Sequence, residues 1–136
     1  MKYITITTIA LLLIISNFSF SQNLIGQHVN DIKATMSKLR PKYHIDNTTV
    51  EAKSVKFIDQ GGDNTLIFFI DEKGFCKYQK FMMEVNFAKN TVDTLTKNYK
   101  YLDNLTWLDK RNDKDYLIKM QNNDYYFTVV YSLKED

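Results

Sequence analysis

The stretch NTLIFFIDEKGFCKYQKFMME, residues Asn64–Glu84, decides the fold because it predicts a buried β-hairpin. Every residue from Leu66 to Ile70 is apolar, and a short apolar run between turn signals is typical of a strand covered on both faces. Residues Asp71–Gly74 supply the turn, since Asp favours the first position of a type I turn and Gly tolerates positive φ. We therefore expect this hairpin in the middle of a sheet, with helices over at least one face.

The turn also predicts which residues of the two strands lie opposite each other. It places Ile70 opposite Cys76 and Phe68 opposite Tyr78. One face of the hairpin would then carry Leu66, Phe68, Ile70, Cys76 and Tyr78. The other face would carry Ile67, Phe69, Phe75, Phe81 and Met83. Neither face is polar enough to favour full exposure to water, which supports the central placement.

The first 21 residues have the pattern of a cleavable secretory signal. Lys2 provides a basic start, Ile4–Ile15 form an apolar segment, and Ser19 and Ser21 are small residues before the cleavage point at Gln22. The apolar segment is shorter than the roughly 20 residues needed to span a bilayer, so an uncleaved anchor is the weaker alternative. We predict an exported protein, periplasmic or extracellular, whose residues 22–136 form a single α+β domain.

Two segments carry the apolar stripe of an amphipathic helix, with spacings of four and three residues. The first stripe is Ile25, Val29, Ile32, Met36 and Leu39, and the second is Ala88, Val92, Leu95, Tyr99 and Leu102. Pro41 would end the first helix. Asn86 or Asn90 would cap the second helix, and Asp103-Asn104 would end it.

The sequence of the remaining segments predicts strands and polar turns. Besides the hairpin, strands are expected at Lys53–Asp59, Leu105–Leu108, Tyr116–Met120 and Tyr125–Ser132, with polar loops at Lys42–Ala52 and Asp109–Lys114. The order α-β-β-β-α-β-β-β predicts an α+β fold, with an antiparallel sheet of about six strands and two helices packed on one face. The other face would be partly open, and an exposed aromatic patch there would be a natural interaction surface.

Composition argues against several classes of function. Without the signal, 17 basic and 16 acidic side chains remain, a net charge of +1 that calls for neither nucleic acid nor an anionic membrane. Lysines outnumber arginines 16 to 2, so few bidentate phosphate contacts are available. One cysteine and two histidines do not form a zinc motif, and no phosphate-binding glycine loop is present. We therefore expect no metal and no cofactor.

Candidate catalytic groups are few. The single cysteine, Cys76, cannot form an internal disulfide, and its apolar neighbours predict a buried thiol rather than a reactive one. His28 and His44 precede no patterned nucleophile. The run Asp109–Asp115 lacks the central Gly and closing Glu of a calcium loop. We assign no catalytic residue.

Aromatic residues offer the remaining candidates, since the chain has nine Tyr, nine Phe and one Trp. Trp107, Tyr125 and Tyr126 are candidate interaction residues, with core packing as the alternative role. We predict an exported bacterial binding domain without catalytic activity, acting on a protein, peptide or cell-envelope component. The alternatives are a small extracytoplasmic enzyme, a hydrolase or a thiol-dependent catalyst using Cys76 or His44, and a carrier of a small apolar ligand.

Overall fold

The computed structural model describes residues 23–39, 43–47 and 53–136, which form one antiparallel sheet and two helices. The predicted secretory signal, Pro41 and most of the predicted loop Lys42–Ala52 lie outside the described residues. So does the side chain of Leu39.

The elements form a helix followed by four strands, twice. The first unit contains α2 (Val29–Leu39), β1 (Tyr43–Ile45), β2 (Ser54–Asp59), β3 (Thr65–Ile70) and β4 (Cys76–Glu84). A single 3-10 turn, η2 (Val85–Phe87), leads into the second unit. That unit contains α3 (Ala88–Asn98), β5 (Lys100–Tyr101), β6 (Thr106–Arg111), β7 (Lys114–Asn122) and β8 (Tyr126–Leu133).

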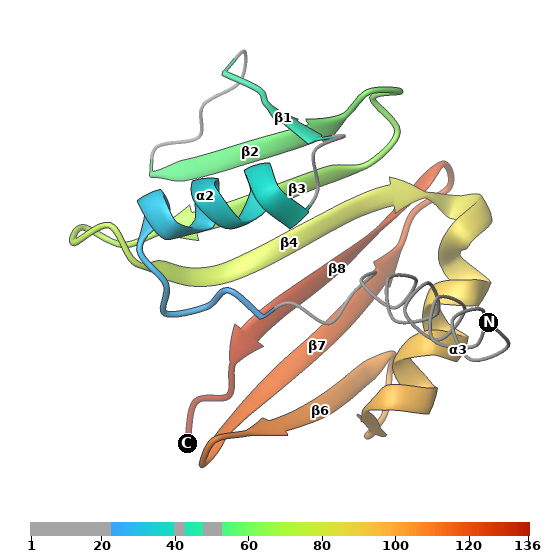
Figure 1. The fold of residues 1–136 in the computed structure, drawn as a ribbon. Helices are drawn as coiled ribbons and strands as arrows, with labels where there is room; N and C mark the ends of the chain where they lie inside the picture. Colours follow the sequence, from blue (N-terminus) through green and yellow to red (C-terminus); the bar gives the residue numbers. More distant parts are fainter. Residues whose placement is uncertain (1–22, 40–42, 48–52) are drawn as a thin grey trace, which may run out of the picture.

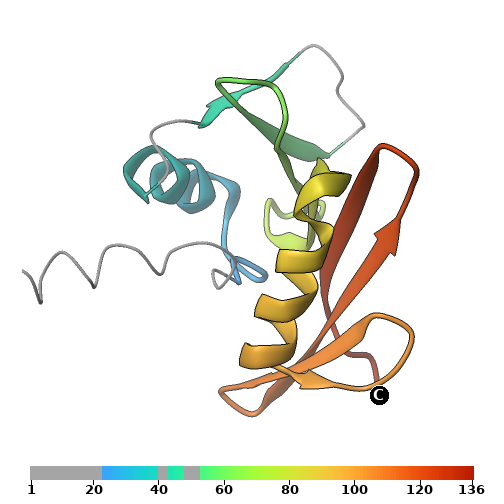
Figure 2. The same ribbon diagram turned by 90° about the vertical axis from the view of Figure 1, so that its right-hand side faces the viewer.

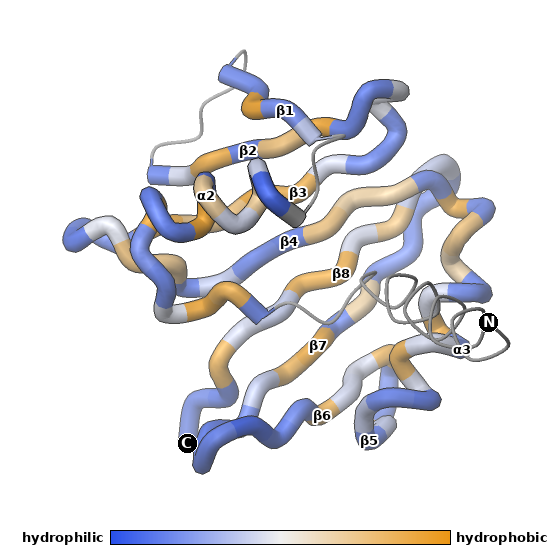
Figure 3. The backbone as a smooth tube through the Cα atoms, viewed as in Figure 1, coloured by the Kyte–Doolittle hydropathy of each residue, from blue (hydrophilic) through white to orange (hydrophobic). Residues whose placement is uncertain are grey.

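The sheet runs in the order β1-β2-β3-β4-β8-β7-β6-β5, and every neighbouring pair is antiparallel. The last strands of the two units, β4 and β8, therefore pair at the centre, and both helices lie on the same side of the sheet (Figures 1 and 2). Hydrophobic segments lie in β2, β3, β7 and β8, whereas the middle of β4 and most of the turns are hydrophilic (Figure 3). The α+β class is confirmed.

The predicted strand count and order are wrong, because the sheet has eight strands and each unit contains four. Strand β1 lies in the segment predicted to be a polar loop, and β5 follows a helix that ends at Asn98. Both are edge strands of two or three residues, too short to show an alternating pattern. The second predicted stripe was therefore too long, and Leu102 is exposed.

The central hairpin is confirmed, but its register is shifted by a β-bulge. Ile70 pairs with Cys76 as predicted, whereas Phe69, not Phe68, pairs with Tyr78. The extra residue is Lys77, and a bulge of this kind moves the rest of the strand to the opposite face. Gln79, Phe81 and Met83 consequently share a face with Leu66 and Phe68, while Tyr78 joins Ile67 and Phe69.

The face under the helices holds the core. Its central strands contribute Leu66, Phe68, Phe81, Ile118, Val129 and Tyr131, all buried. Ile32 and Met36 pack onto it from α2, and Leu95 packs onto it from α3. We call this the core face. The opposite side, which neither helix covers, is the open face (Figure 2).

The hairpin turn is held by the segment that precedes α2. Gly26 N–H donates to Cys76 O (2.8 Å) and Val29 N–H donates to Gly74 O (2.9 Å). His28 Nδ1 caps the helix by accepting from Asn30 N–H (3.3 Å), and its ring packs edge-on against Phe75. Gly74 has φ +90°, and a Cβ built there would lie 2.7 Å from His28 Nε2. Only glycine fits that position without displacing the cap.

We predict that Gly74→Ala destabilises the fold more than Gly62→Ala. Gly62 also has positive φ (+76°) but open space around it, so alanine there should cost only the backbone strain of about 1–2 kcal/mol. Gly74→Ala should cost about 1–2 kcal/mol more, because the His28 ring must leave its rotamer and its cap. Denaturant unfolding of both variants measures the difference. In a His28→Ala background the excess should disappear, and an unchanged excess would contradict this explanation.

Candidate functional site

The catalytic arrangement that a thiol mechanism needs is not assembled. Cys76 is buried on the core side of β4, where desolvation raises the pKa of its thiol to about 12. Its Sγ–H donates to Tyr78 O (3.4 Å). His44 is exposed on the edge strand β1, with β2 and β3 between it and β4. His28 serves as a helix cap. Nothing in this geometry activates the thiol.

The described part of the chain contains no group of three His, Cys, Asp or Glu residues that could hold a metal ion. Within the same residues, neither helix is long and apolar enough to cross a membrane.

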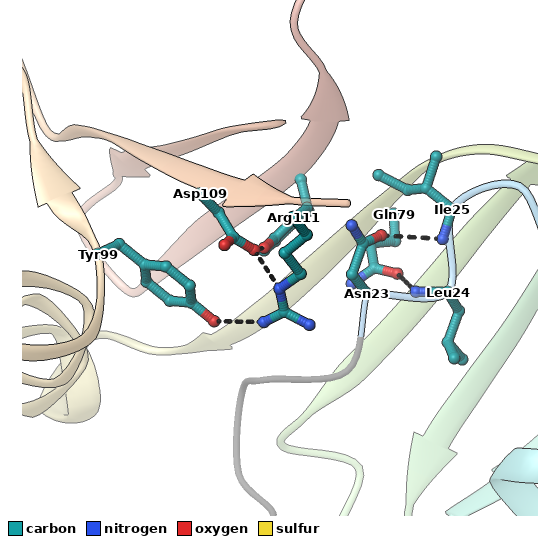
Figure 4. Close-up of polar contacts among 8 residues, drawn as sticks. Asn23, Leu24, Ile25, Gln79, Tyr99, Asp109 and Arg111 are labelled. Carbon is teal, nitrogen blue, oxygen red and sulfur yellow. Dashed lines mark hydrogen bonds and ion pairs between the residues drawn. The ribbon is translucent and has the colours of Figure 1, made fainter. Parts of the chain in front are cut away.

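A polar cluster lies on the core face beside the end of α3 (Figure 4). Asp109 is buried and its Oδ2 accepts from Tyr131 O–H and from Arg111 Nε (2.8 Å), while Arg111 Nη2 donates to Tyr99 O–H (3.4 Å). Burial raises the pKa of the Asp109 carboxyl, and the Arg111 guanidinium acts in the opposite direction. Burial also raises the pKa of Tyr99.

These contacts give the polar cluster a structural role. They connect β6 and β8 with the residue that follows α3, and no buried side-chain polar atom of the described residues lacks a partner. The sequence had placed Asp109 in a solvated turn. The turn is only Asn112-Asp113, both at positive φ, the two-residue connection that suits a tight hairpin.

Gln79 is a second buried polar group on the core face. Its Oε1 accepts from Leu24 N–H (3.1 Å), which fixes the N-terminal segment across the centre of the sheet (Figure 4). Asn23 Oδ1 in turn accepts from Ile25 N–H (3.0 Å). The space between helices and sheet, where an apolar ligand would bind in the carrier hypothesis, is occupied by core side chains such as Ile32, Leu95 and Trp107.

The three predicted interaction residues fall in two different environments. Trp107 is fully buried, and its Nε1–H donates to Thr96 Oγ1 on α3 (3.1 Å), so its ring belongs to the core. Tyr125 is 85% exposed in the β7–β8 turn, and Tyr126 is 40% exposed at the start of β8. Only the two tyrosines lie where a partner can reach them.

Exposed apolar side chains gather around these tyrosines. Val85 N–H donates to Tyr125 O (3.1 Å), so the β7–β8 turn lies beside η2 (Figure 1). Tyr126 pairs with Glu84, and Phe87 at the end of η2 is 49% exposed. We call Val85, Phe87, Tyr125 and Tyr126 the tip patch. Sequence reasoning missed Val85 and Phe87, because only the β4–β8 register brings η2 to the β7–β8 turn.

The open face is amphiphilic rather than polar. Phe69 stacks on Tyr78 with ring centroids 4.3 Å apart, and Leu117 lies opposite Leu108. The register adds four more half-buried apolar residues, Ile58, Ile67, Met82 and Val130. Lysines stand between them, most centrally Lys80 and Lys119. Such a face can contact both apolar and charged groups.

The chain was compared with protein-family models, curated proteins and solved structures, and none of them matches it.

We predict that Cys76 is unreactive in the folded protein. With a pKa of about 12, only about one thiol in 10⁴ is ionised at pH 8, and the side chain is buried. A thiol reagent such as Ellman's should label no cysteine in the native state at that pH and one per chain in denaturant. Rapid stoichiometric labelling of the native protein would contradict this prediction and support the alternative of a thiol-dependent enzyme.

Proposed function

We propose that this protein is a non-catalytic binding domain, exported from the bacterial cytoplasm, that holds a protein partner against its tip patch and open face. The observation that carries the proposal is the tip patch. Four of the ten large apolar residues exposed in the described chain gather there, on segments joined by the Val85–Tyr125 hydrogen bond.

Solvent exposure of this patch has a physical cost. Clusters of exposed apolar side chains on small soluble domains often mark the sites where a partner binds. Binding there is favourable because it releases the water that surrounds the apolar surface. Tyrosine is also among the residues that contribute most to binding energy at protein interfaces, since it offers a large apolar ring and a hydroxyl. Tyr125 and Tyr126 combine both properties at the edge of the patch.

The open face supports the same proposal. It adjoins the tip patch through Tyr126, which lies on the open side of β8 next to Thr128 and Val130. Two helices cover only one side of the eight strands, so this second surface remains available (Figure 2). The absence of an activated nucleophile in the described residues leaves binding as the function that the surface supports best.

The export part of the proposal rests on the N-terminal sequence, with its basic start, short apolar segment and small residues before Gln22.

The test is capture from the extracytoplasmic fraction of the source cell, with the protein recovered in its natural form. The mass of the recovered protein should match a chain that begins at Gln22. A defined partner should be captured with the wild-type protein. The double variant Tyr125→Ser/Tyr126→Ser should capture at least about tenfold less of that partner, because tyrosine hot spots contribute roughly 2 kcal/mol or more to binding.

Tyr101→Ser is the control, because Tyr101 (47% exposed) is about as exposed as Tyr126 (40%) but lies on β5 at the far edge of the sheet. That variant should retain the partner. Equal capture by all three proteins, or no captured protein at all, would overturn the binding proposal. Recovery of the full-length chain from the cytoplasm would overturn the proposal that the protein is exported.

A further inference from the structure

The open face carries one straight row of residues that crosses the sheet. The register places Lys56 of β2, Ile67 of β3, Lys80 of β4, Val130 of β8 and Lys119 of β7 directly beside one another. Every second position is therefore a lysine, and every position between is aliphatic. We call these five residues the lysine row.

The spacing of the lysine row follows from sheet geometry. Neighbouring strands lie about 4.8 Å apart, so successive lysines of the row are separated by roughly 10 Å. Lys80 is half-buried and pairs with Ile67 on one side and Val130 on the other. A lysine between aliphatic neighbours typically packs its stem against them and keeps its ammonium in water. Along the row, each lysine thus has an aliphatic residue as its neighbour on the next strand.

Two of these three cations have no acidic partner among the described residues. Lys56 pairs with Asp46 (2.9 Å), but the ion pairs formed within this part of the chain include neither Lys80 nor Lys119. The paired strands place five lysines and two carboxylates on the open face, and Asp46, the ion-pair partner of Lys56, adds a third carboxylate. Five lysines and three carboxylates leave this face with a net charge of +2.

We propose that the lysine row binds an acidic amphipathic helix of a partner protein, with carboxylates at every seventh position and apolar side chains between them. This inference rests on the proposed binding function and specifies the partner's chemistry. Residues seven apart on a helix lie about 10.5 Å apart on one face, which matches the row. Same-face residues of an extended strand are about 7 or 13 Å apart and do not match.

A bilayer fits the lysine row less well than a helix does. Strand directions in a sheet rotate by about 20–25° per strand, so a face that spans β2 to β7 is saddle-shaped rather than flat. A flat anionic membrane would reach only part of the row, and its headgroups would leave Ile67 and Val130 uncovered. A helix crossing the strands can place apolar side chains over both.

The probe is a synthetic amphipathic helical peptide with Glu at every seventh position and Leu on the same face, labelled for fluorescence anisotropy. The wild-type protein should bind it with an affinity that falls with added salt, because exposed charge pairs are screened. A peptide with Gln in place of Glu should bind at least about tenfold more weakly.

Two double variants with the same change in net charge show whether the Glu peptide binds at the lysine row. Lys80→Glu/Lys119→Glu should weaken binding of the Glu peptide by about tenfold or more. Lys33→Glu/Lys97→Glu changes exposed lysines on α2 and α3, on the opposite side of the sheet, and should stay within about twofold. Circular dichroism and thermal melts establish that both variants are folded.

Other outcomes overturn the inference. Equal losses in the two variants would mean a general charge effect, and no salt-sensitive binding of the Glu peptide would mean that the row does not select acidic helices. Preferential binding to phosphatidylglycerol vesicles, lost in Lys80→Glu/Lys119→Glu, would assign the row to a membrane. The proposed function would survive any of these results if the partner captured from cells still depended on Tyr125 and Tyr126.

Discussion

Two helices cannot cover both sides of an eight-stranded sheet, and the rest of the structure depends on that constraint. Pairing of β4 with β8 joins two helix-and-strand units into one sheet, and both helices bury their apolar stripes on the same side of it (Figure 2). The largest buried side chains, including Trp107 and Phe127, collect there. The other side keeps half-buried apolar residues with lysines between them, because no element of the described chain shields it from water.

The polar side chains Gln79 and Asp109 are tolerated in the core face because each makes hydrogen bonds that hold parts of the fold together. Gln79 anchors the N-terminal segment, and Asp109 joins strands to the end of α3 through Tyr131 and Arg111. A buried charge is costly unless paired and hydrogen-bonded, and both conditions are met here. Both buried polar groups thus stabilise the fold.

Features encoded locally could be predicted from the sequence, and those set by distant contacts could not. The central hairpin followed from an apolar run and an Asp-to-Gly turn, both read directly from neighbouring residues. Its bulge at Lys77 coincides with the docking of Gly26 and Gln27 on Cys76, contacts some 50 residues apart in the sequence. Asp109 looked solvated because its partners are defined only by the fold. Tyr125 and Tyr126 could be named as candidates, but Phe87 joins them only through the β4–β8 register.

The most direct test of the two-sided sheet compares adjacent residues of β3, Phe68 on the core face and Phe69 on the open face. Denaturant unfolding of Phe68→Ala should show a loss of about 3–5 kcal/mol, as expected for a fully buried phenylalanine. Phe69→Ala should lose about 1–2 kcal/mol, because that ring is half-buried and rests on Tyr78. Equal losses, or a larger loss for Phe69→Ala, would contradict the assignment of one covered and one open face.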